Sequence, residues 1–575
     1  MRKILALSLC FASLLAAPAF AQDVAPEPAT GFTAKPPVHA ARHMVVSGNR
    51  LASLAGDAML EQGGNAVDAA IATALALNVV EPQASGIGGG GFMLFYDKGA
   101  GKTYAYDGRE TAPAAATPDM FLDEGGKPYP YTDILKGGLS VGTPGLLRMC
   151  EAAHKAGGKL PWKDLFAPAV ALAEHGYALS SRVRAEIVFA PYIAGTPEAR
   201  ELFFEKNGAI KPVGAVITNP QFAKTLRLIA DKGADAFYRG DVAKEIVEKV
   251  RHNAFRPGRL TEKDLADYRA EERTPLCDAY RDARICAAPP PASGGLAVLQ
   301  ALKLTERFNL RTLPFQDPKA VHIAVDALRL AFADRNAYVA DCDAVPAKAM
   351  LDSRYVKKRS ALISESRSIT SPAPGRFSGA ERCGKNAPVT EHPSTSHISV
   401  VDAEGNAVSM TNSIEYAFGS GVMAAGFFLN NELTDFSFIP EENGKEVANR
   451  IEPGKRPRSS MTPALVFDDA GALKLVVGSP GGSRIISFVF QTLLLSLEWG
   501  LNINEAIDAP HFAFAGGPLE LEKNTPLADL AAPLRAMGHD VAVTDETSGL
   551  HAIEIRNGEL IGAADGRREG EAVGR

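Results

Sequence analysis

The chain has no excess of positive charge, no zinc-ligand spacing and no internal repeat, and each absence removes a class of protein. Its 61 Lys and Arg residues are outnumbered by 67 Asp and Glu residues, which gives a net charge of −6 and a pI near 6.1. Without a basic stripe or an RNA-binding motif, nucleic-acid binding is not indicated. The composition, 46% hydrophobic and 22% charged, is that of an ordinary globular protein. A chain of 575 residues is too long for one simple domain, although a single large core with insertions remains possible.

Long apolar runs are missing except at the N-terminus. A basic start, an apolar stretch over residues 4–15 and the small-x-small site Ala19-Phe20-Ala21 predict a signal peptide over residues 1–21. The alternative is a membrane anchor, but the stretch is shorter than the ~20 residues that a spanning helix needs. We expect an exported, soluble protein, periplasmic or secreted, that starts at Gln22 with a flexible leader over residues 23–37.

Cysteine is scarce, with six residues, one of which falls in the signal peptide. Cys277 and Cys286 flank a plausible hairpin, so a cross-strand disulfide is favoured in an exported protein. Cys342 and Cys383 would form a second pair and leave Cys150 free. The alternative is that all five are reduced and buried, since free cysteine is often buried.

The distribution of helical and strand patterns predicts the fold. Residues 143–335 are mainly helical in pattern, whereas the C-terminal part is dense in strands. Two hairpins, over residues 395–413 and 464–477, are apolar on both strand faces, which is typical of central strands covered on each side. Antiparallel sheets covered by helices predict a four-layer αββα sandwich, an α+β fold with a large helical portion.

Thr395 is the most informative residue, because it begins the first of these hairpins. The turn at Gly405-Asn406 places Thr395 opposite Ser413 or its immediate neighbour, where cross-strand Cβ atoms are about 5 Å apart. If the peptide bond before Thr395 is cut, the freed α-amine, with a pKa near ~8, can act as base for its own hydroxyl. The alternative is structural, since threonine is common in strands.

Other residues offer the remaining parts of a catalytic site. Gly481-Gly482 lies at a strand-to-helix turn whose amides could stabilise an oxyanion, or the glycines could serve only close packing. Glu432 and Asp435 could hold an ammonium group, or belong to a helix cap or solvated turn. Arg109 could bind a carboxylate through two nitrogens, and Ser459-Ser460 could assist it, although loop serines are often plain turn residues.

Two glycine-containing motifs invite comparison with other classes of protein, the phosphate-binding proteins and the serine hydrolases. Gly88-Gly89-Gly90-Gly91 lacks the Gly-Lys-Ser/Thr ending of a phosphate-binding loop. Gly138-Leu139-Ser140-Val141-Gly142 matches the G-x-S-x-G pattern of serine hydrolases, but no convincing buried strand precedes it. A serine hydrolase that uses Ser140 is therefore a weaker alternative.

Eight sequence blocks, in order, make the chain resemble the γ-glutamyltransferases (γ-glutamyltranspeptidases) over nearly the whole mature length. The blocks are Gly64-Asn65-Ala66-Val67-Asp68-Ala69-Ala70, Pro82-Gln83-Ala84-Ser85-Gly86-Ile87-Gly88-Gly89-Gly90-Gly91-Phe92-Met93, Arg109-Glu110, Pro289-Pro290-Pro291-Ala292-Ser293-Gly294-Gly295, Thr395-Ser396-His397, Asn430-Asn431-Glu432-Leu433-Thr434-Asp435-Phe436, Lys455-Arg456-Pro457-Arg458-Ser459-Ser460-Met461 and Gly478-Ser479-Pro480-Gly481-Gly482-Ser483-Arg484.

This resemblance implies an N-terminal-nucleophile hydrolase made as a self-cleaving precursor. Residues 22–394 would form the large subunit and residues 395–575 the small, catalytic subunit of a heterodimer, without metal or organic cofactor. Thr395 would be the nucleophile, Ser413 its hydroxyl partner, and Gly481 and Gly482 the oxyanion hole. The resemblance assigns the substrate ammonium to Glu415, Glu432 and Asp435, and the α-carboxylate to Arg109, Ser459 and Ser460. Residues 437–454 correspond to the lid loop.

The implied reaction is cleavage of the γ-glutamyl amide of glutathione and related compounds through a γ-glutamyl ester on Thr395. Water, an amino acid or a peptide would accept the group. A related acylase for cephalosporin-type side chains would keep Thr395 but could relax the grip on the α-amino acid, which the retained Arg109, Glu432 and Asp435 disfavour. A binding protein without catalysis would stay uncleaved.

Overall fold

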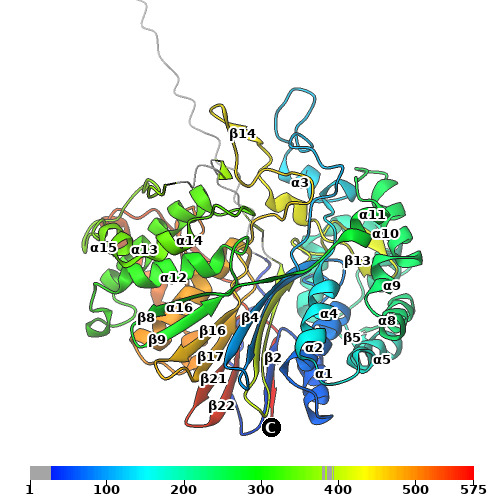
Figure 1. Ribbon diagram of the computed structural model, residues 1–575, viewed down its shortest axis with the longest axis horizontal. Helices are drawn as coiled ribbons and strands as arrows, with labels where there is room; N and C mark the ends of the chain where they lie inside the picture. Colours follow the sequence, from blue (N-terminus) through cyan, green and yellow to red (C-terminus); the bar gives the residue numbers. More distant parts are fainter. Residues whose placement is uncertain (1–26, 379–382, 385–390, 393) are drawn as a thin grey trace, which may run out of the picture.

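The computed structural model describes residues 27–378, 383–384, 391–392 and 394–575, and two seven-stranded sheets stacked face to face form its centre (Figure 1). The predicted signal peptide lies outside the described residues. The first sheet has the order β23 (Glu571–Gly574), β2 (Met44–Ser47), β10 (Thr395–Val401), β11 (Ala407–Ser413), β3 (Gly90–Asp97), β4 (Lys102–Asp107) and β7 (Glu271–Arg273). The second has the order β1 (Val38–Ala40), β22 (Glu559–Ala564), β21 (His551–Arg556), β17 (Leu473–Gly478), β16 (Ala464–Asp468), β9 (Ala283–Ala287) and β8 (Leu276–Tyr280).

Helices cover the outer face of each sheet, so the predicted four-layer αββα sandwich is confirmed (Figure 1). Beside the first sheet lie α1 (Arg50–Glu61), α2 (Ala66–Val80), α4 (Leu146–Gly157), α5 (Ala167–His175) and α8 (Pro220–Lys232). Beside the second lie α12 (Gly294–Thr305), α13 (Pro318–Tyr338), α14 (Ala347–Leu351), α15 (Ser353–Ser360), α16 (Ile485–Glu498), α17 (Ile503–Asp508) and α18 (Ala531–Ala536). The remaining helices are α3 (Tyr131–Ile134), α6 (Ser181–Phe189), α7 (Pro197–Phe203), α9 (Asp235–Tyr238), α10 (Asp241–Arg251) and α11 (Glu262–Asp267).

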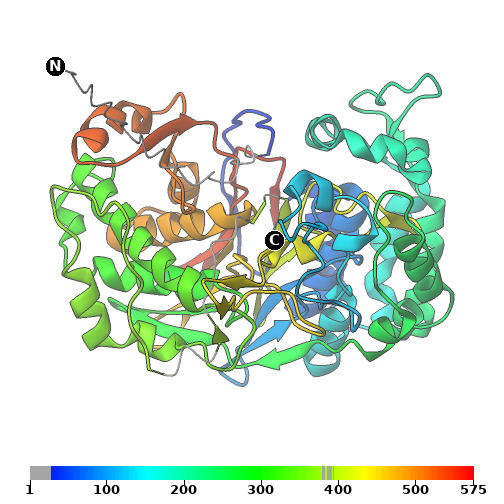
Figure 2. The ribbon, with the colours of Figure 1, turned by 90° about the horizontal axis from the view of Figure 1, so that it is seen from above.

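The helical portion divides between the two sides of the molecule (Figure 2). In this view the helices of about residues 160–270, coloured cyan to green, gather on one side, and those of about 290–360 lie on the other. Short strands complete the chain: β5 (Tyr177–Ala178), β6 (Val216–Ile217), β12 (Met423–Ala424), β13 (Phe427–Phe428), β14 (Glu441–Glu442), β15 (Lys445–Glu446), β18 (Phe512–Ala513), β19 (Leu519–Glu522) and β20 (Val541–Thr544). The predicted lid, residues 437–454, contains the β14–β15 hairpin.

The hairpin β10–β11 occupies the middle of the first sheet, between β2 and β3. All seven residues of each strand are buried, because α2 packs on one face and the second sheet on the other. The helix α2 fits this position since all its residues are buried and it has no polar face. Asn65 and Asp68 form a capping box at its start. The burial of both faces fixes the register of β10 and hence the position of Thr395.

The cysteines are arranged as the sequence predicts. Cys277 and Cys286 form a disulfide across β8 and β9, and Cys342 forms one with Cys383. Cys150 is free and buried in α4. The alternative of five reduced cysteines is therefore wrong for this structure.

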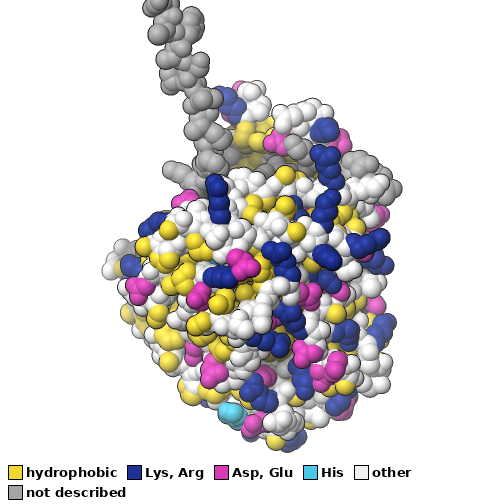
Figure 3. Space-filling model, turned by 90° about the vertical axis from the view of Figure 1, so that its left-hand side faces the viewer, with side chains coloured by type: hydrophobic (Ala, Val, Ile, Leu, Met, Phe, Trp, Pro, Cys, Tyr) yellow, Lys and Arg dark blue, Asp and Glu magenta, His cyan; other side chains and the backbone are white. Residues whose placement is uncertain are grey.

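Two observations concern the described residues, one on membrane-spanning helices and one on the charge of the face in Figure 3. No helix among the described residues is long and apolar enough to cross a bilayer. On the face in Figure 3, the described part carries Lys and Arg side chains interspersed with Asp and Glu. This mixture fits the slightly negative net charge of the sequence.

Candidate active site

Thr395 and Ser413 face each other at the open end of the β10–β11 hairpin. The register pairs them directly, and the Thr395 hydroxyl donates a hydrogen bond to Ser413 Oγ over 3.2 Å. The turn that sets this register contains Gly405 with φ of 82°, a left-handed conformation that suits glycine. Asp402 fixes the turn by accepting hydrogen bonds from the amides of Glu404 and Asn406. The two hydroxyls are therefore held by a central, buried hairpin.

The Ser413 hydroxyl also contacts the peptide bond before Thr395. Ser413 Oγ donates to the Ser394 carbonyl over 2.7 Å and accepts from the Glu415 amide over 2.9 Å. Ser394 Oγ donates to the carbonyl of Gln83, which holds the residue before Thr395. A hydrogen bond from Ser413 thus polarises the Ser394 carbonyl of the peptide bond that precedes Thr395.

Gly481 and Gly482 form the turn between β17 and α16, as predicted. Their φ angles of 131° and 58° are left-handed, which explains the use of glycine. Among the described residues, neither amide donates a hydrogen bond. A Cβ on Gly482 would lie 2.6 Å from the Glu391 carbonyl oxygen, so the turn packs directly on the chain that leads to Thr395. Two unused amides at a helix start are suited to an oxyanion.

Arg109 follows β4 and is fully buried, and each of its three guanidinium nitrogens donates a hydrogen bond to the protein. It donates to the carboxylates of Glu432 and Asp435 and to the backbone carbonyls of Pro457 and Arg458. Burial would lower the pKa of Arg109, but the attraction of Glu432 and Asp435 outweighs it and raises that pKa. The resemblance assigned Arg109 and the two carboxylates to opposite ends of a ligand, whereas in the structure they pair with one another.

Four buried carboxyl groups gather near Arg109: Glu110, Glu415, Glu432 and Asp435. Burial is the largest cause that raises the pKa of each, and that of Glu415 reaches about 8. Among the described residues, Oε2 of Glu432 and Oδ1 of Asp435 have no hydrogen-bond partner. Such unsatisfied buried acceptors are costly unless a ligand donates to them. The group is therefore suited to an ammonium ion.

Glu415 is held by two residues that the sequence did not single out for the site, Tyr131 and Asn431. The Tyr131 hydroxyl lies 3.1 Å from both Glu415 carboxylate oxygens, and the Asn431 amide donates to one of them. Glu415 has φ of 78°, which is strained for a residue with a side chain. No sequence pattern pointed to Tyr131, because it lies far from Glu415 along the chain.

Ser459 and Ser460 lie together in a loop that the Pro289–Gly295 block supports. Ser293 donates to the Ser459 carbonyl through both its amide and its hydroxyl. Ser460 Oγ accepts from Arg335 over 2.7 Å, and the Ser460 amide donates to the Glu391 carboxylate. Sequence reasoning missed Arg335 and Glu391, since neither lies in a motif. Arg458 was quoted in a motif but was not recognised as a site residue.

The two alternative glycine motifs have structural roles. Ser140 is buried in a short 3-10 helix, Gly138–Ser140, and its hydroxyl lies 3.2 Å from the Leu135 carbonyl. A Cβ on Gly88 would meet the Phe428 carbonyl oxygen at 2.1 Å. These contacts favour close packing over catalysis or phosphate binding.

The described residues contain one group that could hold a metal ion: His322, Asp326 and His539. The nearest ring nitrogens of the two histidines are 2.7 Å apart, and the other His322 nitrogen lies 2.8 Å from the Ser364 carbonyl. Two nitrogens on one tetrahedral zinc ion would lie about 3.3 Å apart. The geometry is that of hydrogen-bonded histidines, and no predicted site residue belongs to the group.

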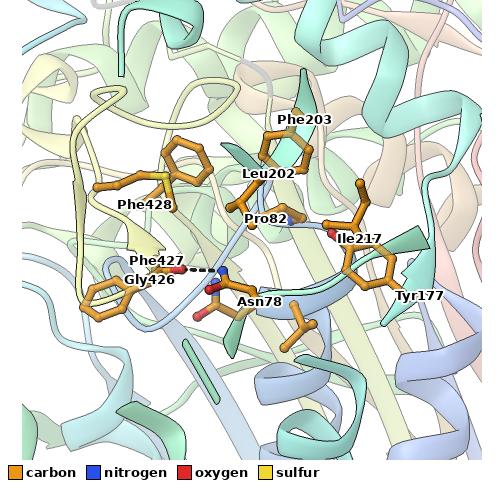
Figure 4. A pocket seen from close by; sticks show the side chains of 12 residues that line it. Asn78, Pro82, Tyr177, Leu202, Phe203, Ile217, Gly426, Phe427 and Phe428 are labelled. Atoms are coloured by element: carbon orange, nitrogen blue, oxygen red, sulfur yellow. Dashed lines mark hydrogen bonds between the residues drawn. The ribbon is translucent and has the colours of Figure 1, made fainter. Parts of the chain in front are cut away.

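A small apolar cavity lies between the helical portion and β13 (Figure 4). It measures about 10 Å³, and its lining includes Tyr177, Phe203 and Phe427. The dashed line in Figure 4 is a hydrogen bond of 2.8 Å from Asn219 to the Gly426 carbonyl. This space holds no more than a water molecule and does not include Thr395.

Comparisons with known proteins identify relatives of this chain. The family described as Gamma-glutamyltranspeptidase matches residues 52–575. The glutathione hydrolase proenzyme of Bacillus subtilis (strain 168) is 38% identical over 545 residues, which cover 92% of this chain and 91% of the relative. A cephalosporin acylase from Bacillus halodurans superposes with a TM-score of 0.83 at 27% identity, covering 96% of this chain and 99% of that one.

The γ-glutamyltranspeptidase of Helicobacter pylori is a second structural relative. It is 36% identical with a TM-score of 0.54 and covers 57% of this chain and 93% of that chain. Both structural relatives support the sandwich fold. Because the family match spans nearly the whole length, the chain belongs to the γ-glutamyltranspeptidase family.

Proposed function

We propose that this protein is a self-processing γ-glutamyltransferase that cleaves the γ-glutamyl amide of glutathione and related compounds. The group would pass to water or to the amine of an amino acid or peptide. One observation carries the proposal: Ser413 contacts both the Thr395 hydroxyl and the Ser394 carbonyl of the peptide bond that would be cleaved. The family match supports the same chemistry.

Maturation would begin with attack of the Thr395 hydroxyl on the Ser394 carbonyl carbon. A new C–O bond forms, the C–N bond breaks, and the proton moves to the leaving nitrogen, which becomes the α-amine of Thr395. Water then hydrolyses the ester and separates residues 22–394 from residues 395–575. The Ser413 hydrogen bond to the carbonyl favours the first step, because negative charge develops on that oxygen.

Turnover would use the new α-amine as base. Glu415, Glu432 and Asp435 would hold the substrate ammonium, and Arg109, Ser459 and Ser460 its α-carboxylate, which positions the γ-amide at Thr395. The hydroxyl attacks, the Gly481 and Gly482 amides stabilise the oxyanion, and the amine passes the proton to the leaving group. Water or an acceptor amine then releases the γ-glutamyl group from its ester.

The ammonium site favours a γ-glutamyl donor over the side chain of a cephalosporin. A glutaryl group has no ammonium ion, so it would leave the carboxyl cluster around Glu415, Glu432 and Asp435 without a counter-charge. Buried carboxylates without a partner are unfavourable. A ligand that carries both charges of an amino acid would satisfy Arg109 and the cluster together.

The test is an assay of the purified, exported protein on glutathione, with and without a dipeptide acceptor. We expect glutamate release without the acceptor, a γ-glutamyl dipeptide with it, and a kcat/KM for a glutaryl anilide at least about 10-fold below that for the γ-glutamyl anilide. Preference for the glutaryl anilide would instead identify an acylase. An intact chain without turnover on either compound would identify a binding protein.

Export to the periplasm or beyond is part of the proposal. The N-terminal pattern of the sequence supports it, and both disulfides fit an oxidising compartment. Recovery of the mature protein from the periplasmic or medium fraction, beginning at Gln22, would be the direct observation.

Ser413→Ala should slow maturation strongly. The substitution removes the donor to the Ser394 carbonyl and the acceptor for the Thr395 hydroxyl, and loss of one such donor typically reduces a rate by about 10²- to 10³-fold. A time course on a denaturing gel measures cleavage. Ser413→Thr keeps the hydroxyl and is the matched control, which we expect to mature at near the normal rate. Equal rates for both variants would contradict this role.

A further inference from the structure

The disulfide between Cys342 and Cys383 packs against the predicted lid, residues 437–454. Ala448 of the lid belongs to one apolar cluster with both cysteines. A Cβ on Gly384 would lie 3.2 Å from the Ala448 amide nitrogen, so the backbone next to Cys383 contacts the backbone of the lid. The disulfide therefore holds together a surface on which this part of the lid packs.

Asn449, the next residue of the lid, connects this surface to the candidate ammonium site. Its side-chain amide donates to the Asp435 carbonyl over 2.7 Å, and its side-chain oxygen accepts from the Arg458 amide over 2.9 Å. Its own carbonyl accepts from the Ser437 amide, and the residue is completely buried. Asn449 thus fixes the backbone of Asp435, whose carboxylate belongs to the ammonium site.

A second contact links Cys342 to the loop of the proposed carboxylate-binding serines. Asp341, the residue before Cys342, accepts a hydrogen bond of 2.9 Å from the Arg456 amide. Arg456 precedes Ser459 by three positions on the same loop. The disulfide is thus next to contacts with both chain segments that carry proposed donor-binding residues.

The two cysteines differ in their access to solvent. Cys383 is 8% exposed, whereas Cys342 is only partly buried. Thiol–disulfide exchange requires a thiolate to reach one of the two sulfur atoms, and Cys342 Sγ is the more accessible one. Attack there would form a mixed disulfide and release the Cys383 thiolate, which takes up a proton. A second small thiol would then displace Cys342 as a thiol, so two small thiols are oxidised to one disulfide as the cystine is reduced.

We infer that the Cys342–Cys383 disulfide is a thiol-sensitive support of the donor site, which keeps Asn449 and Asp435 in place while it is oxidised and weakens donor binding when a small thiol reduces it. Without the bond, the chain at Cys383 is no longer held against the lid. The inference rests on the proposed γ-glutamyl activity and adds a regulation of the same site. The proposed donor, glutathione, is itself a small thiol and can act as the reductant.

Replacement of both cysteines, Cys342→Ser with Cys383→Ser, tests the support in the processed enzyme. With a γ-glutamyl anilide, which has no thiol, we expect KM to rise by about 3- to 10-fold, as for the loss of one hydrogen bond, and kcat to change by less than about twofold. Cys277→Ser with Cys286→Ser is the matched control, since this disulfide joins β8 and β9 at an edge of the second sheet. The control should lower the melting temperature without a change in KM.

The response to thiols is tested on the control variant, Cys277→Ser/Cys286→Ser, which keeps the Cys342–Cys383 disulfide. The mature variant is treated with dithiothreitol or with glutathione, and gel filtration without oxygen removes the thiol before the anilide assay. We expect the same rise in KM as for the replacement of both cysteines, and its reversal on reoxidation. Alkylation and mass spectrometry count the thiols beyond Cys150. This measurement also replaces the first one if Cys342→Ser/Cys383→Ser does not mature.

Asn449→Ala separates this role from general damage. If the disulfide acts through Asn449, this variant should raise KM by itself, and adding Cys342→Ser with Cys383→Ser should raise it no further, because contacts in one network are not additive. An unchanged KM after loss of the bond, an equal rise in the control variant, full additivity with Asn449→Ala, or a disulfide that neither thiol reduces would overturn the inference. Absence of γ-glutamyl turnover in the untreated, unmodified enzyme would instead overturn the proposed function.

Discussion

Thr395→Ala is expected to leave one uncleaved chain without turnover. The substitution removes the hydroxyl that would attack the Ser394 carbonyl, and without that cleavage no α-amine appears at position 395. Loss of a nucleophile typically reduces turnover by on the order of 10⁴- to 10⁶-fold. A denaturing gel gives the number of fragments, and N-terminal sequencing of the small fragment of the unmodified protein should begin at Thr395.

Two controls separate this result from general damage. Thr395→Ser keeps a hydroxyl at the start of β10 and should still mature, although more slowly. Ser140→Ala removes the hydroxyl of the G-x-S-x-G motif and should neither prevent cleavage nor reduce turnover, since Ser140 lies in a buried 3-10 helix. A cleaved and active Thr395→Ala variant, or an inactive Ser140→Ala variant, would contradict the assignment of the nucleophile.

Arg109→Met should produce the largest loss of stability among the site variants. Glu432 and Asp435 would remain buried without their main counter-charge, and such broken buried pairs typically cost about 3–5 kcal/mol in the free energy of unfolding. Urea denaturation of the uncleaved Thr395→Ala chain, with and without Arg109→Met, measures the difference on a single polypeptide.

The loss should also depend on pH. Without Arg109, the pKa values of Glu432 and Asp435, which burial already raises, rise further, so the folded chain binds more protons than the unfolded chain above pH ~4. The free energy of unfolding therefore falls as the pH increases through this window, and the variant is least impaired at acidic pH.

Neutral side chains at both carboxylate positions provide the control for Arg109→Met. Adding Glu432→Gln and Asp435→Asn should recover most of the lost stability, because no buried charge is then left unpaired. A loss that is the same at pH 5 and pH 8, or that persists in the triple variant, would show that Arg109 stabilises the fold by packing alone.

Local patterns in the sequence were sufficient to predict the β10–β11 hairpin and the four-layer sandwich. The turn at Gly405 and the apolar faces of both strands determine which residues pair, so the contact between Thr395 and Ser413 followed from the sequence. The disulfide between Cys277 and Cys286 followed in the same way, since its residues are neighbours across one hairpin.

The charge arrangement of the site could not be predicted in this way. Arg109 and Glu432 are far apart in sequence, and the resemblance gives their roles toward a ligand but not their pairing with one another. A buried charged side chain pairs with the oppositely charged or polar groups next to it, and tertiary packing determines which groups these are. Arg335 contacts Ser460 and Glu391 for the same reason, from the middle of α13, where no motif indicates a site.

The order of strands in the two sheets has a consequence for the proposed heterodimer. β10, after the cleavage point, pairs with β2, before it, and β11 pairs with β3; in the other sheet β16 pairs with β9 and β22 with β1. Both sheets would thus contain strands of both products, and strands of one product would pair with strands of the other. The described disulfides both join residues upstream of Thr395, so no cystine links the products. Interleaved strands alone would make them inseparable without unfolding, and mature subunits would not exchange between molecules.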